Sequence, residues 1–172
     1  PLEDFETDAL IEQASSMTDE HELIIRTLLH TGMRADELAH MQSNWVNWRK
    51  GEIRVQPAGD WTPKSQAGHR VIPLRDPDVQ RLLNQLFSQQ SGIEMSRTTI
   101  WRRVTDVADE TNIAKKISPH VLRHTYGTTI AAEGASAQFI KQTMGHQHLA
   151  TSQQYIEYSG RRIHQEADAI WG

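Results

Sequence analysis

One short segment rich in β-branched and aromatic residues interrupts a chain that is otherwise patterned for helices. Residues 44–73 contain the runs WVNW, EIRVQ and HRVIPL. Gly51 separates the first two runs, and the turn-rich stretch PAGDWTPKSQAG separates the last two. Short runs of this kind between turn formers are typical of antiparallel strands. The sequence therefore predicts an α+β fold whose only sheet is small, three-stranded and antiparallel.

Helical patterns fill the rest of the chain. Thr18 can cap a helix whose apolar face includes Ile24 and Leu28, and Gly32 can end that helix. We predict a single, mostly helical domain over residues 1–172, with an acidic leading helix or linker at 1–17 and a tail helix at 161–172. Besides the helix that Thr18 caps, helices are expected at residues 4–16, 34–41, 77–90, 97–110, 118–133, 136–144, 151–159 and 161–170.

Charge is unevenly distributed along the chain. The net charge is −4, yet the first 22 residues hold eight acidic residues and no Lys or Arg, which leaves 18 basic and 14 acidic residues elsewhere. This asymmetry hints at an anionic partner, although a solvated acidic helix face explains it equally well. The chain has no Cys, which excludes disulfides and cysteine catalysis. No apolar run reaches the ~18 residues that a bilayer span needs.

The stretch SPHVLRHTYGTT, residues 118–129, gathers chemically active side chains at a predicted helix start. Ser118 and Pro119 suit the N-cap and first helical position, which puts His120 in the first turn, where free backbone N–H groups favour anions. Arg123 and His124 follow on the same face. The stretch could bind zinc, could cap and pack an ordinary helix, or could hold a phosphate.

Zinc binding is the weakest of these interpretations. His120 and His124 have ligand spacing, but Val121 stands where a metalloprotease motif needs Glu, and an Arg between the ligands would repel the cation. Taken alone, the stretch favours the ordinary helix. An Arg fork and an imidazole at a helix start suit a phosphate or phosphoryl transition state, but only with partners elsewhere in the chain.

Four motifs together resemble those of the tyrosine recombinases, or phage integrases. SPHVLRHTYGTTIAAEG resembles their His-x-x-Arg box, and TGMRADEL (31–38) resembles their first arginine box. WTPKSQAGHRVIPL (61–74) resembles the hairpin with the catalytic lysine, and MGHQHLATSQQY (144–155) resembles the closing box with the nucleophilic tyrosine. Each motif is weak alone, but four in this order, across about residues 5–160, are specific.

The resemblance implies a site-specific recombinase that cuts and rejoins DNA through a 3′-phosphotyrosyl intermediate, without ATP, a metal or a cofactor. Glu37 is implied as a support that orients a basic group, and His124 as a support that holds the site together. The implied catalytic residues are Arg34, Lys64, His120, Arg123, His146 and the nucleophile Tyr155.

The chemistry of phosphodiester cleavage accounts for this set. A tyrosine, with a pKa of about 10, needs a base or positive surroundings to become a nucleophile. Two arginine forks, Arg34 and Arg123, can hold the non-bridging oxygens of the transition state. Lys64 on a hairpin can protonate the leaving oxygen, one histidine can assist proton transfer from the tyrosine, and another can hydrogen-bond the phosphate.

Neighbouring residues compete for three of these roles. Tyr126 and Tyr158 are rival nucleophiles, but the spacing from His146 favours Tyr155. Thr151 is expected to cap a short detachable helix that carries Tyr155. His148 is a rival for the role of His146. His69 and Arg70 could lie near Lys64 and are rivals for its role.

The resemblance also implies double-stranded DNA as a partner, a homo-oligomer on that DNA, a cytoplasmic location and no membrane. An apolar stripe that includes Ile163 and Trp171 marks the 161–172 tail, which either packs on its own domain or docks on a neighbouring protomer. Because the chain begins at Pro1 and shows no N-terminal core-binding domain, we expect the catalytic portion of a longer protein.

Two other functions stay open. Residues 137–158 have helix–turn–helix character, so the chain could be a non-catalytic DNA-binding module, although that leaves Arg34, Lys64 and Arg123 unexplained. A type IB topoisomerase would use the same chemistry to relax DNA rather than to exchange strands. The sequence does not separate relaxation from exchange.

Overall fold

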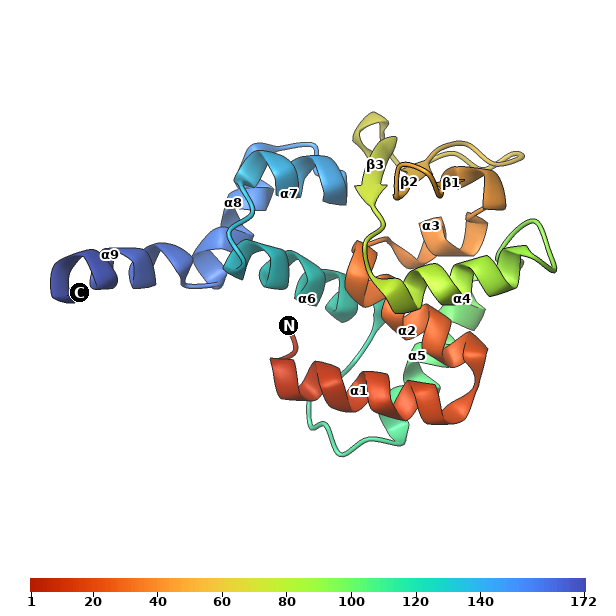
Figure 1. The fold of residues 1–172 in the computed structure, drawn as a ribbon, viewed down its shortest axis with the longest axis horizontal. Coiled ribbons are helices and arrows are strands. Elements are labelled where there is room, and N and C mark those ends of the chain that lie inside the picture. Colours follow the sequence, from red (N-terminus) through yellow and green to blue (C-terminus); the bar gives the residue numbers. More distant parts are fainter.

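The computed structural model describes residues 1–172 and shows nine α-helices and one small sheet (Figure 1). In chain order the elements are α1 (Asp4–Met17), α2 (Asp19–Thr31), α3 (Ala35–His40), η1 (Ser43–Trp45), β1 (Val46–Asn47), β2 (Glu52–Val55), η2 (Gln66–Gly68), β3 (Arg70–Pro73), α4 (Pro77–Phe87), α5 (Arg97–Asp109), α6 (Pro119–Ala132), α7 (Ala137–Met144), α8 (Leu149–Tyr158) and α9 (Arg161–Trp171). The predicted α+β class is confirmed.

The sheet is three-stranded and antiparallel in the order β1-β2-β3, as the sequence predicted. Ile53 of β2 pairs with Val46 on one side and Ile72 on the other, and the alternating burial of β2 turns one face toward the core. β1 is shorter than predicted, because the buried Trp45 belongs to the preceding 3₁₀ turn. Gly51 makes the β1–β2 turn with a left-handed φ of 65°.

Most helix boundaries follow their local signals. Thr18 and Ser118 accept backbone hydrogen bonds as the N-caps of α2 and α6, and Gly32 ends α2 with a left-handed φ of 67°. The predicted cap of α8 is wrong, because this helix begins at Leu149 and Thr151 lies within its first turn.

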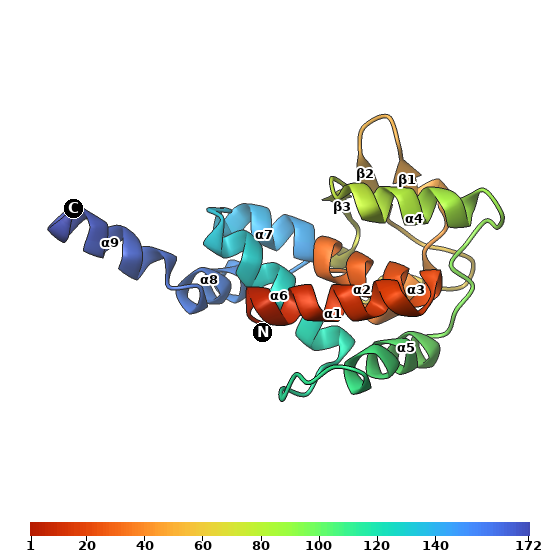
Figure 2. The same cartoon turned by 60° about the horizontal axis from the view of Figure 1, so that its bottom comes forward.

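The acidic leading segment is a packed part of the domain. α1 lies against α2 (Figures 1 and 2), and its Leu10 is fully buried. Glu6 accepts a hydrogen bond from Lys115 Nζ at 2.7 Å. Leu2 N–H donates to Thr125 Oγ1 on α6 at 2.9 Å. Residues 1–17 therefore form a layer of the domain and not a linker.

The apolar interior is divided into two unequal parts. The main cluster of 27 buried residues lies among α1–α5, the sheet and the start of α6. A second cluster of six residues, from α6, α7 and α8, includes Tyr126 and Tyr155. Because few apolar contacts hold α7 and α8, this part of the domain can open at a lower cost than the main core.

The tail helix α9 projects away from the domain (Figures 1 and 2). None of its residues is buried, and Ile163, Ile170 and Trp171 are 72%, 68% and 81% exposed. Arg161 fixes the start of α9 by donating to the carbonyls of Ala131 and Ala135. The interpretation that the apolar stripe packs on its own domain is therefore wrong. None of the helices is both long and apolar enough to span a membrane.

Candidate active site

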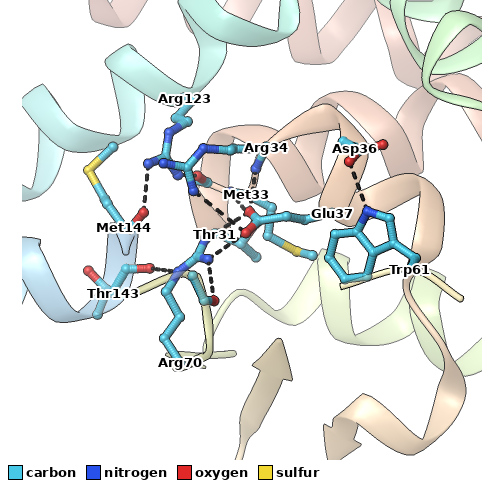
Figure 3. A network of polar contacts seen from close by, with 12 residues as sticks. Thr31, Met33, Arg34, Asp36, Glu37, Trp61, Arg70, Arg123, Thr143 and Met144 are labelled. Atoms are coloured by element: carbon cyan, nitrogen blue, oxygen red, sulfur yellow. Dashed lines mark hydrogen bonds and ion pairs between the residues drawn. The ribbon is translucent and has the colours of Figure 1, made fainter. Parts of the chain in front are cut away.

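Arg123 lies buried where three helices meet. Its guanidinium donates to the carbonyl of Gly32, after α2, and to that of Met144, at the end of α7, at 2.6 Å (Figure 3). Burial first, and the charges of Arg34 and Arg70 second, lower the pKa of Arg123 to about 9. This pKa is above neutral pH, so the buried guanidinium of Arg123 is positively charged and can bind an anion.

Glu37 orients two arginines around this point. Its buried carboxylate accepts Arg70 Nη1 at 2.6 Å and Arg70 Nη2 at 2.9 Å, a bidentate pair. It also accepts the backbone N–H of Arg34 at 2.8 Å, and Arg34 Nη1 lies 3.6 Å from Oε2. Burial raises the pKa of Glu37, but hydrogen bonds and charge from Arg70, then Arg34, lower it overall. Glu37 is therefore ionised at neutral pH.

Arg70, expected only near the place of Lys64, lies at the centre of the site. Besides Glu37, its Nε donates to the carbonyl of Thr143 at 2.7 Å, and Nη1 donates to that of Gly68 at 2.9 Å. Figure 3 shows the side chains of Arg34, Arg70 and Arg123 converging around Glu37 from different elements. The available signal was Glu37 itself, because a buried carboxylate requires a cationic partner.

Lys64 lies apart from this network. It is exposed in the loop between β2 and β3 and makes no hydrogen bond or ion pair. Trp61 anchors the base of the loop, because its Nε1 donates to Asp36 at 2.9 Å and its ring stacks on His40 with centroids 4.9 Å apart. The loop thus has a fixed base and an exposed Lys64.

Tyr155, on α8, packs against α6 and lies between two histidines. Its hydroxyl is 2.7 Å from Nδ1 of His124, and its ring is parallel to that of His146, with centroids 5.7 Å apart. A Cβ on Gly127 would come within 2.6 Å of the tyrosine ring, so the glycine makes this close approach possible. Burial raises the pKa of Tyr155, although Arg123 opposes the rise.

The three histidines of the site have different surroundings. His124 Nε2 lies 2.7 Å from Nε2 of the exposed His120, whereas His146 Nδ1 lies 2.8 Å from Ser152 Oγ. Burial, followed by the site arginines, lowers the pKa of His146 to about 4, so this ring is neutral at pH 7. The pKa of His124 is also lowered, first by burial and then by His120. His124, expected only as a support, is the one that contacts the Tyr155 hydroxyl.

The rival residues lie elsewhere. Tyr126 is buried, and its ring would lie 2.3 Å from a Cβ on Gly32, which makes it a packing residue. Tyr158 is 68% exposed and has no site contact. His148 stands at the N-terminus of α8 without a side-chain cap bond, and His69 is exposed on the β2–β3 loop.

A mostly helical domain with one small sheet, in which the buried Arg123 lies near a tyrosine whose hydroxyl contacts His124, defines the catalytic domain of a tyrosine recombinase. The phage integrase family model matches residues 2–161, and the chain belongs to this family.

Known relatives agree with this assignment. Tyrosine recombinase XerD of Staphylococcus aureus (strain Mu50) is 29% identical over 156 residues, which cover 81% of this chain and 50% of XerD. The crystal structure of XerA recombinase superposes with a TM-score of 0.78 at 27% identity, over 96% of this chain and 64% of XerA. The Tn1549 transposon integrase in complex with transposon right end DNA shares the fold, with a TM-score of 0.75 at 20% identity, over 98% of this chain and 66% of the integrase. The chain spans about half the length of the curated relatives it matches.

Proposed function

We propose that this chain is the catalytic portion of a site-specific DNA recombinase that uses Tyr155 as its nucleophile. The main support is the position of the buried Tyr155, whose hydroxyl lies 2.7 Å from Nδ1 of His124. The buried guanidinium of Arg123 is close enough to act on its charge. A phosphodiester is the substrate that suits this arrangement, because a tyrosine attack on phosphorus needs both proton removal and fixed positive charge.

The proposed reaction begins when the Tyr155 oxygen attacks a DNA phosphorus. A 3′-phosphotyrosyl bond forms, and the bond between phosphorus and the 5′ oxygen breaks. Arg34 and Arg123 hold the non-bridging oxygens, and Glu37 keeps Arg34 in place through its backbone N–H and guanidinium. The exposed Lys64 swings in with its loop and protonates the leaving 5′ oxygen.

Rejoining reverses these steps with a different 5′-hydroxyl. The phosphotyrosyl ester keeps the energy of the original bond, so the exchange needs no ATP, and the arginines supply the charge stabilisation without a cofactor. His120, exposed at the start of α6, is available to hydrogen-bond the phosphate. His146 is neutral and packs flat on the Tyr155 ring, which orients the nucleophile.

Double-stranded DNA is the proposed partner, and the cytoplasm is the proposed location because a bacterial or phage recombinase meets its DNA there. The DNA complex of the structurally similar Tn1549 integrase supports this partner. We further propose self-association on DNA through the exposed apolar stripe of α9.

A covalent trapping experiment tests the proposal. The 172-residue chain is incubated with nicked duplexes that carry a randomised central segment, and protein–DNA adducts are separated on a denaturing gel and sequenced. We expect an adduct that Tyr155→Phe abolishes and the exposed control Tyr158→Phe retains. Absence of any adduct, or an adduct that survives Tyr155→Phe, would contradict the proposed function.

The alternative functions make different predictions. A helix–turn–helix module would present Tyr155 to DNA, but this side chain is only 8% exposed and its hydroxyl is engaged by His124. A type IB topoisomerase would form the same adduct and then relax a supercoiled plasmid. Exchange of strands between two trapped duplexes, without relaxation, favours the recombinase.

A further inference from the structure

Three side chains form a continuous hydrogen-bonded row from the site interior to solvent. The Tyr155 hydroxyl lies 2.7 Å from His124 Nδ1, and His124 Nε2 lies 2.7 Å from His120 Nε2. Exposure increases along the row, from the buried Tyr155 through the half-buried His124 to the exposed His120. The two imidazoles meet edge to face, with centroids 4.2 Å apart.

One assignment of the protons satisfies every contact in the row. A neutral imidazole has one donor nitrogen and one acceptor nitrogen. If Tyr155 donates its hydroxyl proton to His124 Nδ1, His124 carries its own proton on Nε2 and donates it to His120 Nε2. His120 must then carry its proton on Nδ1. Every contact in the row has one proton, and both rings are neutral.

We propose that His124 is the base that accepts the Tyr155 proton, and that His120 carries the displaced proton toward solvent. This inference rests on the proposed function. As the Tyr155 oxygen bonds to phosphorus, its proton moves to His124 Nδ1 and the proton on His124 Nε2 moves to His120 Nε2. The P–O5′ bond breaks, and the leaving oxygen takes a proton from Lys64. In rejoining, the departing tyrosine oxygen recovers its proton from His124.

The surroundings of His124 suit a base that is neutral before the substrate binds. The groups that face it are Tyr155, His120, Arg123, His146 and the amino-terminal amine. Burial and the neighbouring cations keep this ring unprotonated at neutral pH, so it can accept a proton. The same cations stabilise the developing tyrosinate. His146 is excluded from the role, because its Nδ1 faces Ser152 and it makes no hydrogen bond to the tyrosine hydroxyl.

A pH–rate profile of single-turnover cleavage tests this role. The probe is the nicked duplex recovered from the trapping experiment. We expect His124→Gln, which keeps hydrogen bonding but accepts no proton, to slow cleavage at pH 7 by about 10²- to 10⁴-fold. Its rate should then rise about tenfold per pH unit, as free tyrosinate becomes more abundant. His120→Gln, which leaves the base in place, should slow cleavage by only about tenfold.

A substrate with sulfur in place of the 5′ bridging oxygen separates the base from the leaving-group acid. A thiolate leaves without protonation, so this substrate should rescue Lys64→Ala but not His124→Gln. Cleavage by His124→Gln within threefold of the unmodified chain, or its rescue by the sulfur substrate, would overturn the relay while leaving the proposed function intact. Failure of the unmodified chain to form an adduct would overturn both.

Nitrogen-15 NMR of the histidine rings gives a readout that needs no DNA. We expect the unmodified chain to show His124 protonated on Nε2 and His120 on Nδ1. Replacing Tyr155 by Phe should change the Nδ1 shift of His124 and leave the ring nitrogens of the exposed His164 unchanged. A His124 ring protonated on Nδ1 would contradict the proposed direction of proton transfer.

Discussion

His146 lies flat against Tyr155, with ring planes 1° apart, and its Nδ1 is directed to Ser152 Oγ rather than to the tyrosine hydroxyl. The histidine nearer in sequence therefore positions the ring, whereas His124, 31 residues before the tyrosine, contacts its oxygen. Orientation and proton transfer are thus assigned to different histidines.

Stability should depend on pH through His146. Its folded-state pKa of about 4 lies below its ordinary value of 6.5, so the unfolded chain binds this proton more readily. The contribution of neutral His146 to the stability of the folded chain is complete above pH 6.5 and is lost as the pH falls toward 4. We expect the free energy of unfolding to fall by roughly 3 kcal/mol across this window. Urea melts at pH 7, 6 and 5 measure this slope, and His146→Asn should flatten it. An equal slope in His146→Asn would contradict the assignment.

The Glu37–Arg70 pair should be essential for stability. Glu37→Ala leaves the Arg70 guanidinium buried without a counter-ion, and we expect a loss of about 3–5 kcal/mol in the free energy of unfolding. The double variant Glu37→Ala/Arg70→Met should recover part of this loss, because the unpaired charge is gone. Glu157→Ala, at an exposed carboxylate without an ion pair, is the matched control and should change stability by less than ~0.5 kcal/mol. Denaturant melts measure these three variants and the single variant Arg70→Met, and additive effects at positions 37 and 70 would argue against the coupling.

Lys64 should act on the leaving group and not on the fold. Lys64→Ala removes an exposed side chain, so the melting curve should not move. Cleavage of an ordinary phosphodiester should slow by about 10²- to 10⁴-fold, because the 5′ oxygen then leaves without its proton donor. Lys50→Ala, at an exposed lysine in the β1–β2 turn, is the control. Equal cleavage rates for both variants would assign the acid elsewhere, with Arg70 and His69 as the neighbours to test next.

The tail should matter for assembly alone. A chain that stops after Arg162 keeps the bonds from Arg161 to the carbonyls of Ala131 and Ala135 and loses the exposed apolar stripe. We expect its free energy of unfolding to stay within ~0.5 kcal/mol of the full chain, because no residue of α9 is buried. Sedimentation with the selected DNA should show smaller complexes. Complexes of unchanged size would place the protomer contact outside α9.

Local signals in the sequence determined most of the secondary structure. Ser118 followed by Pro119 fixed the start of α6, Gly32 fixed the end of α2, and the β-branched runs fixed the strands. These features act through bonds within a few residues, so they can be read without knowing the fold. The order of four motifs likewise indicated the family and the residues of the site.

The tertiary structure decided which of these residues touch. Gly127 lets the Tyr155 ring lie on α6, and this close approach brings the hydroxyl to His124 instead of His146. Arg70 pairs with Glu37 because the fold brings β3 close to α3, so that the Arg70 guanidinium reaches the buried Glu37 carboxylate. The stripe of α9 was visible as a pattern, but its exposure was not. Contacts of this kind depend on helix packing and on the room that a missing Cβ leaves, and a linear sequence does not specify either.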